Sequence, residues 1–510
     1  MKQYYLGIEF GSTRVKAVLI DGEHRIVKSG DYTWKSSLEN GVWTYHMEDV
    51  QTGLRTAIRN LGELPGAVSA MGISGMMHGY LAFDKDWNLL APFRTWQNTM
   101  TGEAAEQLTA EFGFNIPQRW SIAHLYQAIL NGEAHVKNIA HITTLAGYVH
   151  YLLTGENVLG VGEASGMFPI DSEALDYDAA MLEKFDALIA KYGFAWTARS
   201  VLPKVLTAGQ AAGALTQAGS TFLDGLLSAG IPFCPPEGDA GTGMTATNAV
   251  ALRTGNVSAG TSIFAMVVLE KPLSKVYQEI DMVTTPSGKP VAMVHCNNCT
   301  NDMNAWVSLL GETAKLFGAE VSTGELFTKL YQKSLEGDAD CSGVLTYNYM
   351  AGEGITHLDE GRPMVVRKPE SSFTLANFLR SQLYATMSTL KLGMDILAEE
   401  HVAIDSLTGH GGLFKTPGVG QKYMAAACRA PVTCMESAGE GGPYGMALLA
   451  SYLVQKQDGQ TLEQYLETEI FADVKRTTLA PDPEDEAGFD RYLSWYRSAL
   501  AAENAAVKAF

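Results

Sequence analysis

Residues 4–20 read YYLGIEFGSTRVKAVLI, and this stretch decides the fold. The β-rich run Tyr4–Phe10 is followed by the turn Gly11–Thr13 and by a second β-rich run that ends at Asp21. Apolar and β-branched runs on both sides of a short glycine-containing turn are typical of paired strands. We therefore predict a strand, a tight turn and a second strand at the start of the chain.

A similar unit occurs in the second half of the chain. Residues 255–269 read GNVSAGTSIFAMVVL, with the small-residue turn Gly260–Ser262 between two β-rich runs. A repeat at about half the chain length indicates two related domains, each opening with a hairpin whose turn exposes backbone N–H groups and hydroxyls. Two such turns facing one cleft would make a phosphate cradle.

A chain of 510 residues is too long to fold around one hydrophobic core, so we expect two large domains. Helical patterns at 107–112, 123–130 and 371–400 lie between the strand-like runs. Because strands and helices alternate along the chain, the fold class is α/β.

The proline- and glycine-rich segment 235–243 interrupts the middle of the sequence. We place the domain boundary just after it, which gives domains 1–250 and 251–510. Near the end of the chain, residues 481–486 predict an acidic, proline-rich linker that leads to a final helix at 492–506.

The charge balance excludes several kinds of partner. The chain has 56 acidic and 37 basic residues and a net charge of -19, which would repel a polyphosphate backbone, so we expect no nucleic-acid partner. No apolar run approaches the roughly 18 residues that span a bilayer, and no signal-peptide pattern is seen at the start. We expect a soluble cytoplasmic protein without a membrane partner. A homodimer is a possible oligomeric state.

The six cysteines are sparse for this length, which fits a reducing compartment. Cys296 and Cys299 have metal-like spacing, but no second cysteine pair or spaced histidine pair accompanies them. Because a structural zinc site needs about four ligands, we assign no structural metal.

Two carboxylates stand where strands should deliver them into a cleft. Glu9 ends the first strand and precedes a turn of glycine and hydroxyl residues, a pattern that can hold the shell of a Mg²⁺ ion. Asp239 follows the apolar segment 229–233 among glycines and could accept a hydroxyl proton in phosphoryl transfer. Ordinary turn residues are the alternative explanation for both.

Three further segments carry polar or glycine-rich patterns. His78, after an apolar run, could donate to a substrate hydroxyl, or be a core histidine bonded to backbone. Residues 406–415 form a glycine-rich turn where a nucleotide could lie, although neither a GxGxxG nor a P-loop pattern is present. Residues 436–447 open an apolar helix, with simple helix packing as the alternative.

Together and in this order, these five elements resemble the FGGY family of carbohydrate kinases, within the actin and hexokinase superfamily. The resemblance covers essentially the whole chain. It is strongest to the xylulose kinases, through residues 73–79, 94–98, 153–156 and 163–167. The resemblance implies two actin-like (ribonuclease H-like) ATPase domains around a central catalytic cleft, the N-terminal one binding sugar and the C-terminal one binding nucleotide.

The resemblance also implies roles for single residues. Asp239 matches the catalytic aspartate, the general base that takes the proton from the sugar hydroxyl. Met77 and His78 match sugar-contacting positions, and Trp96 and Asn98 lie where the family lines the sugar pocket. All of these residues precede the predicted domain boundary.

ATP and Mg²⁺ are the cofactors that the resemblance implies. Glu9 and Asp239 are the candidate metal ligands. The candidate nucleotide contacts are two phosphate turns and an adenosine pocket: Gly11, Ser12, Thr13, Gly260, Thr261, Ser262, Gly411, Gly412 and Gly445.

Several positions depart from the family pattern. Glu9 stands where aspartate is usual, and its extra methylene moves the carboxylate by about one bond length. Ala240 replaces the asparagine common in xylulose kinases, His124 replaces a lysine and Gln127 a tryptophan. Ala240 and Gln127 favour ribulose over xylulose as the sugar.

The leading hypothesis is an ATP-dependent kinase that phosphorylates the terminal hydroxyl of a ketopentose, D-xylulose to D-xylulose 5-phosphate. An L-ribulose, D-ribulose or polyol kinase is the alternative within the family. A non-catalytic regulatory member that binds nucleotide or sugar is the alternative outside catalysis. A chaperone-like ATPase is disfavoured because no β-rich C-terminal module is visible.

Overall fold

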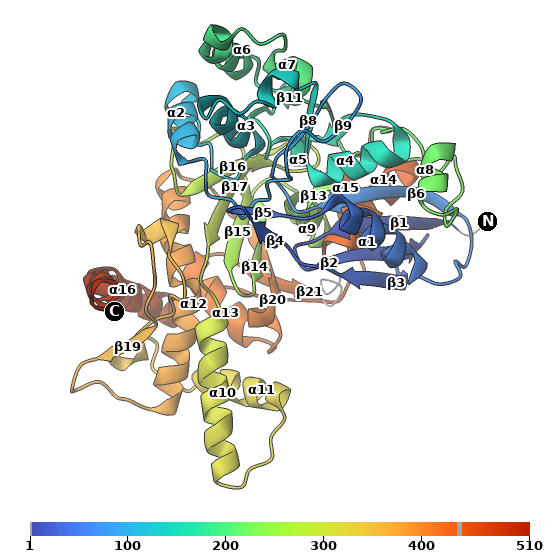
Figure 1. Cartoon of the computed structure of the whole chain (residues 1–510). Helices are drawn as coiled ribbons and strands as arrows, with labels where there is room; N and C mark the ends of the chain where they lie inside the picture. The colour runs from blue at the N-terminus through green and yellow to red at the C-terminus, as the bar shows by residue number, and fades with distance from the viewer. Residues whose placement is uncertain (1–2, 436–440) are drawn as a thin grey trace. The chain divides into compact units, whose positions relative to one another are not determined.

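The computed structural model describes residues 3–435 and 441–510 (Figure 1). These form two compact units, each described here by itself. Of the described residues, unit 1 contains 3–252, 270–292 and 441–474, and unit 2 contains 253–269, 293–435 and 475–510. Two segments from the second half of the chain thus belong to unit 1, and the division into domains 1–250 and 251–510 stays a prediction.

The main sheet of unit 1 has the strand order β13-β6-β1-β2-β3. Its strands are β1 (Tyr4–Phe10), β2 (Arg14–Asp21), β3 (Ile26–Thr33), β6 (Val68–Gly75) and β13 (Glu237–Gly238). β1 pairs with β2 in antiparallel fashion, whereas β6 is parallel to both β1 and β13. The predicted N-terminal strand, turn and strand are therefore confirmed.

Helices cover both faces of this sheet. Leu6, Ile8 and Phe10 share one apolar cluster with residues of α1 (Met47–Arg59). Gly7 points to the opposite face because successive strand residues alternate. There α14 (Gly442–Gln455) approaches so closely that a Cβ on Gly7 would lie 2.0 Å from the carbonyl oxygen of Pro443. Unit 1 is thus a helix–sheet–helix arrangement in which glycine permits the second contact.

The other elements of unit 1 are short strands and helices placed around this core. The helices are α2 (Gly102–Phe112), α3 (Ser121–Leu130), α4 (Leu145–Thr154), α5 (Val161–Ala164), α6 (Ala179–Ile189), α7 (Ala198–Val201), α8 (Gln217–Phe222), α9 (Asp239–Ala246) and α15 (Leu462–Tyr465). The strands are β4 (Ser37–Glu39), β5 (Val42–Thr44), β7 (Leu81–Phe83), β8 (His141–Thr143), β9 (Val158–Gly160), β10 (Ile170–Asp171), β11 (Asp176–Tyr177), β12 (Lys204–Leu206) and β16 (Ile280–Thr284). The helical patterns at 107–112 and 123–130 fall inside α2 and α3.

Unit 2 contains five strands of a second sheet, in the order β15-β14-β20-β21-β22. They are β14 (Thr254–Ala259), β15 (Ile263–Val268), β20 (Ser406–Gly411), β21 (Val432–Met435) and β22 (Arg476–Leu479). β14 and β15 form an antiparallel hairpin, and β20 runs parallel to β14. The second predicted hairpin is confirmed, and each unit's sheet adds a parallel strand beside its hairpin.

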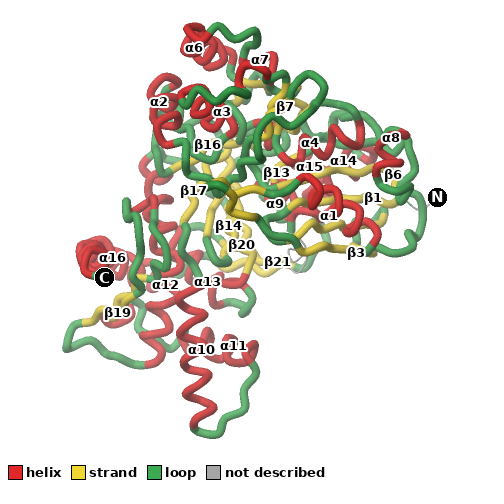
Figure 2. Tube along the Cα trace, in the orientation of Figure 1, coloured by secondary structure: helices red, strands yellow, loops and turns green. Residues whose placement is uncertain are grey.

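The helices of unit 2 include the long α12 (Leu375–Glu399), which matches the pattern predicted at 371–400. Beside the sheet lie α12 and α13 (Val419–Cys428) (Figure 2). The remaining elements are α10 (Asn301–Leu316), α11 (Thr323–Ser334), α16 (Pro483–Ala509), β18 (Val344–Tyr347) and β19 (Met364–Arg367), while β17 (Pro290–Cys296) spans the change from unit 1 to unit 2. Among the described helices, none is long and apolar enough to cross a membrane.

The linker predicted at 481–486 is wrong, because α16 begins at Pro483. The Asp482 side chain caps the helix by accepting hydrogen bonds from the N–H groups of Glu484 and Asp485. A capping aspartate, a proline in the first turn and following acidic residues all stabilise a helix start. Asp485 is buried and pairs with Arg380 and Lys422, so this acidic segment is part of the packed unit.

Candidate active site

Three parallel strands of unit 1 end at one edge of its sheet. The register pairs Gly238 with Gly75 and Gly75 with Phe10, at the ends of β13, β6 and β1. The residues that follow these strands therefore gather there, and the N–H of Met76 donates to the carbonyl of Phe10 (2.9 Å). The sheet thus brings together Asp239, the Met77–His78 segment and the first turn.

Asp239 is the first residue of α9. Its Oδ1 accepts hydrogen bonds from the N–H groups of Met77 (3.2 Å) and Ala240 (3.0 Å). The side chain reaches solvent, but closely packed protein around it raises the pKa of the carboxyl, while these N–H groups and Arg119 act to lower it. Both hydrogen bonds use Oδ1, which fixes the direction of the carboxylate.

Glu9 lies at the end of β1 with a buried Oε2 that has no hydrogen-bond partner among the described residues. A Cβ on Gly442 would lie 1.5 Å from that oxygen, so a larger residue there would displace the Glu9 carboxylate. Burial and the negative charge of Asp239 raise the pKa of Glu9 to about 8, with Lys16 acting in the opposite direction. A carboxylate in this position gains a partner if a cation binds.

This donor set fits Mg²⁺. Mg²⁺ usually takes one or two protein carboxylates and completes its shell with water and phosphate oxygens. Glu9 and Asp239 supply two carboxylates that interact electrostatically, one with an unpartnered oxygen. Within residues 3–435 and 441–510, no group of three or more His, Cys, Asp and Glu side chains is arranged as a complete metal site. The pair therefore suits a cation that arrives with phosphate.

The Met77–His78 segment is held in an unusual backbone shape. His78 is buried and has a φ of 72°, a left-handed value that is uncommon outside glycine. Its Nδ1 donates to the carbonyl of Gly166 (3.1 Å), and its ring stacks on Trp120 with centroids 6.1 Å apart. The structure therefore fixes the imidazole next to the residue that binds Asp239.

Trp96 and Asn98 behave differently from each other. Trp96 is 38% exposed, and its Nε1 donates to the Ser12 hydroxyl (3.3 Å). Asn98 is buried and uses both ends of its amide on the backbone of Trp43, at 2.8 Å each, and on the carbonyl of Thr95. Asn98 thus supports the loop that carries Trp96, and its sugar contact stays a prediction.

The first turn is held by its carbonyl groups. The Trp34 Nε1 donates to the Gly11 carbonyl (2.7 Å), and the Tyr45 hydroxyl donates to the Ser12 carbonyl (2.6 Å). The backbone N–H of Trp34 donates to the carbonyl of Thr13 (3.1 Å). Ser12 and Thr13 are exposed, so the turn presents hydroxyls on its open side.

The second turn and the glycine pair lie at one edge of the sheet in unit 2. Ala259, directly before the turn, pairs with Gly411 across parallel strands. Gly411 has a φ of 98°, and a Cβ there would lie 2.4 Å from the Ala259 carbonyl oxygen, so the position requires glycine. Thr261 and Gly412 are exposed beside it. The five nucleotide residues predicted in unit 2 are therefore neighbours.

Gly445 lies inside α14, where it faces α9. A Cβ on Gly445 would lie 2.0 Å from the carbonyl oxygen of Thr242. Close helix packing therefore accounts for this glycine, and its contact with adenosine stays a prediction. Residues 436–440 of the same motif lie outside the described residues.

Two family models match the chain. The N-terminal domain of the FGGY family of carbohydrate kinases matches residues 4–245, and the C-terminal domain matches residues 255–454. The chain belongs to the FGGY family of carbohydrate kinases.

Similar proteins within this family include kinases for different substrates. The chain is 22% identical to the xylulose kinase of Haemophilus influenzae, over 96% of this chain and 99% of that protein. It is 27% identical to the glycerol kinase of Thermococcus kodakarensis, over 53% of this chain and only 54% of that protein.

Solved structures of similar fold have low sequence identity. A ligand-bound xylulose kinase from Lactobacillus acidophilus has a TM-score of 0.81 at 16% identity, covering 98% of this chain and 99% of that one. A gluconate kinase from the same species has a TM-score of 0.80 at 17% identity, covering 99% of both chains. These likenesses establish the two-domain α/β fold of an FGGY kinase.

Two buried carboxyls beside the candidate active site of this FGGY kinase are not predicted from the sequence. Glu237, two residues before Asp239, accepts hydrogen bonds from the N–H groups of Glu163 (2.9 Å) and Gly162 (3.4 Å). Both carboxylate oxygens of Glu163 are fully buried. Burial raises the pKa of Glu237 to about 8 and that of Glu163 well above its usual value. For Glu237 the sequence signal is an acid in the proline- and glycine-rich segment directly before Asp239.

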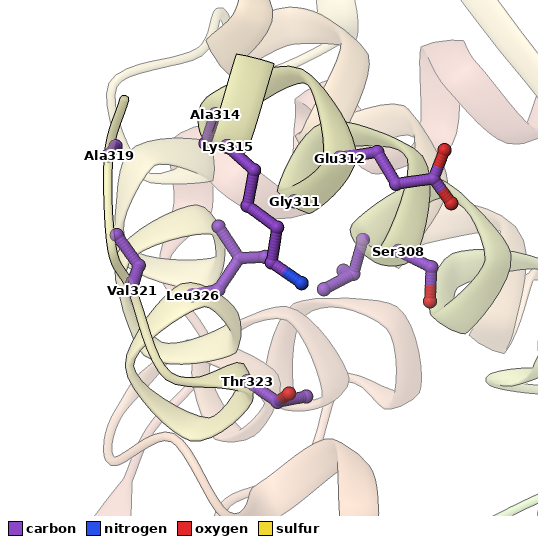
Figure 3. Close-up of a pocket in the computed structure, with 10 residues that line it drawn as sticks. Ser308, Gly311, Glu312, Ala314, Lys315, Ala319, Val321, Thr323 and Leu326 are labelled. Carbon is purple, nitrogen blue, oxygen red and sulfur yellow. The ribbon is translucent and has the colours of Figure 1, made fainter. Parts of the chain in front are cut away.

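A separate cavity of about 260 Å³ opens in unit 2 of the FGGY kinase, between α10 and the segment leading into α11 (Figure 3). Ser308, Glu312, Lys315 and Thr323 line it together with apolar residues, and the Lys315 amine points inward. None of the predicted site residues lines this cavity, so it is not part of the candidate active site.

Proposed function

We propose that this FGGY kinase transfers the terminal phosphoryl group of ATP to the terminal hydroxyl of a ketopentose, converting D-xylulose to D-xylulose 5-phosphate. The observation that carries the proposal is the hydrogen bond from the Met77 N–H to the Asp239 carboxylate, with His78 adjacent. Asp239 as the base, the His78 side chain and the hydroxyl-bearing turn Gly11–Thr13 then lie at the same edge of the sheet. The end-to-end alignment with a xylulose kinase supports the choice of sugar.

In this mechanism Asp239 accepts the proton of the attacking sugar hydroxyl. Its raised pKa makes it a better proton acceptor than an ordinary aspartate, provided that it is ionised. The bonds from Met77 and Ala240 hold the carboxylate in one direction, so the hydroxyl can be oriented for in-line attack. Phosphoryl transfer leaves little covalent work for protein groups, and positioning dominates.

The remaining roles concern charge and water. Gly11–Thr13 and Gly260–Ser262 bind phosphate oxygens through hydroxyl and N–H groups, since a chain of net charge -19 offers no general basic surface. Glu9 and Asp239 hold Mg²⁺, which supplies charge neutralisation on the phosphates when it is bound. His78 and Trp96 contact the sugar, and the burial of His78 against Trp120 excludes water from that side.

A ribulose kinase is the second candidate. Ala240 directly follows Asp239 and its N–H contacts the carboxylate, so this departure lies at the reaction centre. Gln127, the other departure that favours ribulose, accepts a hydrogen bond from the Ala104 N–H of α2 and donates to Asn131 at the end of its own helix α3. Ala240 is therefore the departure that lies at the reaction centre, and the bearing of Gln127 on the choice of sugar stays a prediction.

A coupled ADP-release assay tests the proposal. The purified protein is given Mg-ATP with each member of a panel of pentuloses, hexuloses and polyols, and with ATP alone as the control. We expect D-xylulose to give the largest kcat/KM and ATP alone to give almost no ADP. A larger value for L- or D-ribulose would select the second candidate, and the absence of any sugar-dependent ADP would overturn the proposal.

A further inference from the structure

Glu353 is a buried carboxyl in unit 2, in the loop after β18. Only 1% of its surface is exposed. Its Oε2 accepts hydrogen bonds from the backbone N–H of Asn297 (2.9 Å) and from the side-chain Nδ2 of Asn298 (3.2 Å). Both donors belong to the short segment between β17 and α10. The carboxylate therefore ties this segment to the loop 348–353.

The segment and the loop are joined by further hydrogen bonds. The Asn298 Oδ1 accepts from the N–H groups of Met350 (2.8 Å) and Ala351 (3.0 Å). The Asn297 Nδ2 donates to the Gly352 carbonyl (2.8 Å). On the other side, the Asn348 Nδ2 donates to the Cys299 carbonyl (2.8 Å). Residues 297–299 are thus held by side chains and backbone together.

The next residues of the segment bond to the second phosphate turn. The Cys299 N–H donates to the Thr261 carbonyl (3.0 Å). Thr300 donates to the Gly260 carbonyl from both its N–H (3.1 Å) and its hydroxyl (2.8 Å). A continuous series of hydrogen bonds therefore runs from Glu353 to the turn, entirely within unit 2.

Burying a carboxylate costs folding free energy unless it is well hydrogen-bonded, so a buried Glu353 indicates a specific role. Burial raises its pKa to about 7, while the Asn297 and Asn298 donors lower it. An ionised acceptor makes hydrogen bonds roughly twice as strong as a neutral one. In its ionised form, Glu353 can therefore hold the segment more rigidly than an uncharged side chain could.

We propose that Glu353 is a positioning residue that acts through residues 297–300 to keep the Gly260–Ser262 turn in the shape that binds the phosphates of ATP. This inference rests on the proposed function, since it takes the second turn as a phosphate site. Glu353 is buried and bonds to the turn only through residues 297–300. Its loss should weaken nucleotide binding and leave sugar binding unchanged.

The test compares Glu353→Gln and Glu353→Ala with the matched control Glu503→Gln. Glu503 is also a buried carboxyl of unit 2 that accepts a backbone N–H, from Arg362, but it does not bond to residues 297–300. We expect Glu353→Ala to raise the KM for ATP about tenfold, which corresponds to about 1.4 kcal/mol. Glu353→Gln, which keeps one acceptor oxygen, should raise it about threefold, and Glu503→Gln should leave it unchanged.

Two readouts separate positioning from general destabilisation. The KM for sugar should stay within twofold in all three variants, and calorimetric titration with ADP alone should show the same ranking of affinities. Equal rises in both KM values, or an effect of Glu503→Gln as large as that of Glu353→Gln, would overturn the inference. If Glu353→Ala fails to fold, Glu353→Gln carries the test.

The titration also separates the inference from the proposed function. If the wild-type protein binds ADP but phosphorylates no sugar, the proposed function fails while the Glu353 ranking can still be measured. If the wild type is an active kinase and Glu353→Gln binds ADP as tightly as the wild type, the inference about Glu353 fails while the proposed function stands.

Discussion

The two turns, Gly11–Thr13 in unit 1 and Gly260–Ser262 in unit 2, have the same position between antiparallel strands. Each closes with a short backbone bond, Gly11 N–H to Arg14 carbonyl and Gly260 N–H to Ser262 carbonyl, both 2.9 Å. They differ in what holds their carbonyl groups. Two aromatic residues, Trp34 and Tyr45, hold the first turn.

The second turn is held by backbone N–H groups and one threonine hydroxyl from the segment before α10. The same local pattern is therefore stabilised by unrelated partners. The turn residues specify the shape of the turn, because glycine and small hydroxyl residues permit it. The tertiary fold specifies how rigid that shape is, and here the two units achieve it by different chemistry.

The largest expected effect is on kcat, and it comes from Asp239, which belongs to neither turn. Asp239→Ala removes the proposed base and should lower kcat by about 10³-fold, within the range typical of general bases. Binding of ADP, which depends on the turns, should persist. Steady-state kinetics and calorimetric titration measure the two quantities, and an unchanged kcat would remove Asp239 from the mechanism.

The aromatic support of the first turn can be removed in two steps. Trp34 packs against Phe10 and Tyr45, with ring centroids 5.8 and 4.2 Å apart. Trp34→Ala loses this packing and should lower the free energy of unfolding by about 3 kcal/mol. Trp34→Phe keeps most of the packing, loses the bond to Gly11 and should cost about 1 kcal/mol.

Chemical denaturation followed by circular dichroism measures both variants of Trp34. Equal losses of stability in the two would show that the hydrogen bond, rather than the packing, dominates. Equal stability of all three proteins would show that the aromatic support does not matter.

Charge is a second difference between the units, since acids with raised pKa values crowd the strand edge of unit 1. The folded-state pKa of Glu237 is about 8, above its ordinary value of 4.5. The folded protein therefore favours the neutral form of Glu237. The contribution of this group to the free energy of unfolding is fully present below about pH 4.5 and is lost as the pH rises toward 8.

Glu237→Gln should reduce the dependence of the free energy of unfolding on pH. The reduction should be on the order of 1 kcal/mol for each pH unit over which Glu237 titrates. Urea unfolding at pH 5, 7 and 9 measures the slope for both proteins. Parallel slopes would mean that Glu237 has an ordinary pKa in the folded protein.

The smallest effect concerns one hydroxyl at the second turn. Thr300→Val removes the side-chain bond to the Gly260 carbonyl and keeps the backbone bond. We expect the KM for ATP to rise about three- to fivefold, since one such bond contributes about 1 kcal/mol. Thr313→Val is the control, because its hydroxyl bonds within α10 to Leu309. Equal KM values for the two variants would contradict the role of the bond.

Much of the fold was predictable because its signals are local. Both hairpins follow from apolar runs around small-residue turns, and α12 follows from its periodicity. The start of α16 was also encoded locally, since Asp482 and Pro483 are a capping residue and a first-turn proline. There the acidic composition was misinterpreted as a linker.

The candidate site was predictable only where residue type and resemblance sufficed. Asp239 and His78 are brought to one edge by parallel strands, which a sequence pattern can suggest. The bonding of Asn98 to Trp43, and the burial of Glu163, depend on segments distant in sequence. No local pattern indicates that an acid or an amide will be enclosed by such segments.

The placement of α14 in unit 1 has a consequence for synthesis on the ribosome. One face of β1, at Gly7, is covered by a helix that ends at Gln455. β1 is therefore synthesised long before α14, and this face of its sheet stays uncovered until that helix has been made. During that interval one face of the unit 1 sheet is uncovered, a state in which chaperone binding competes with aggregation.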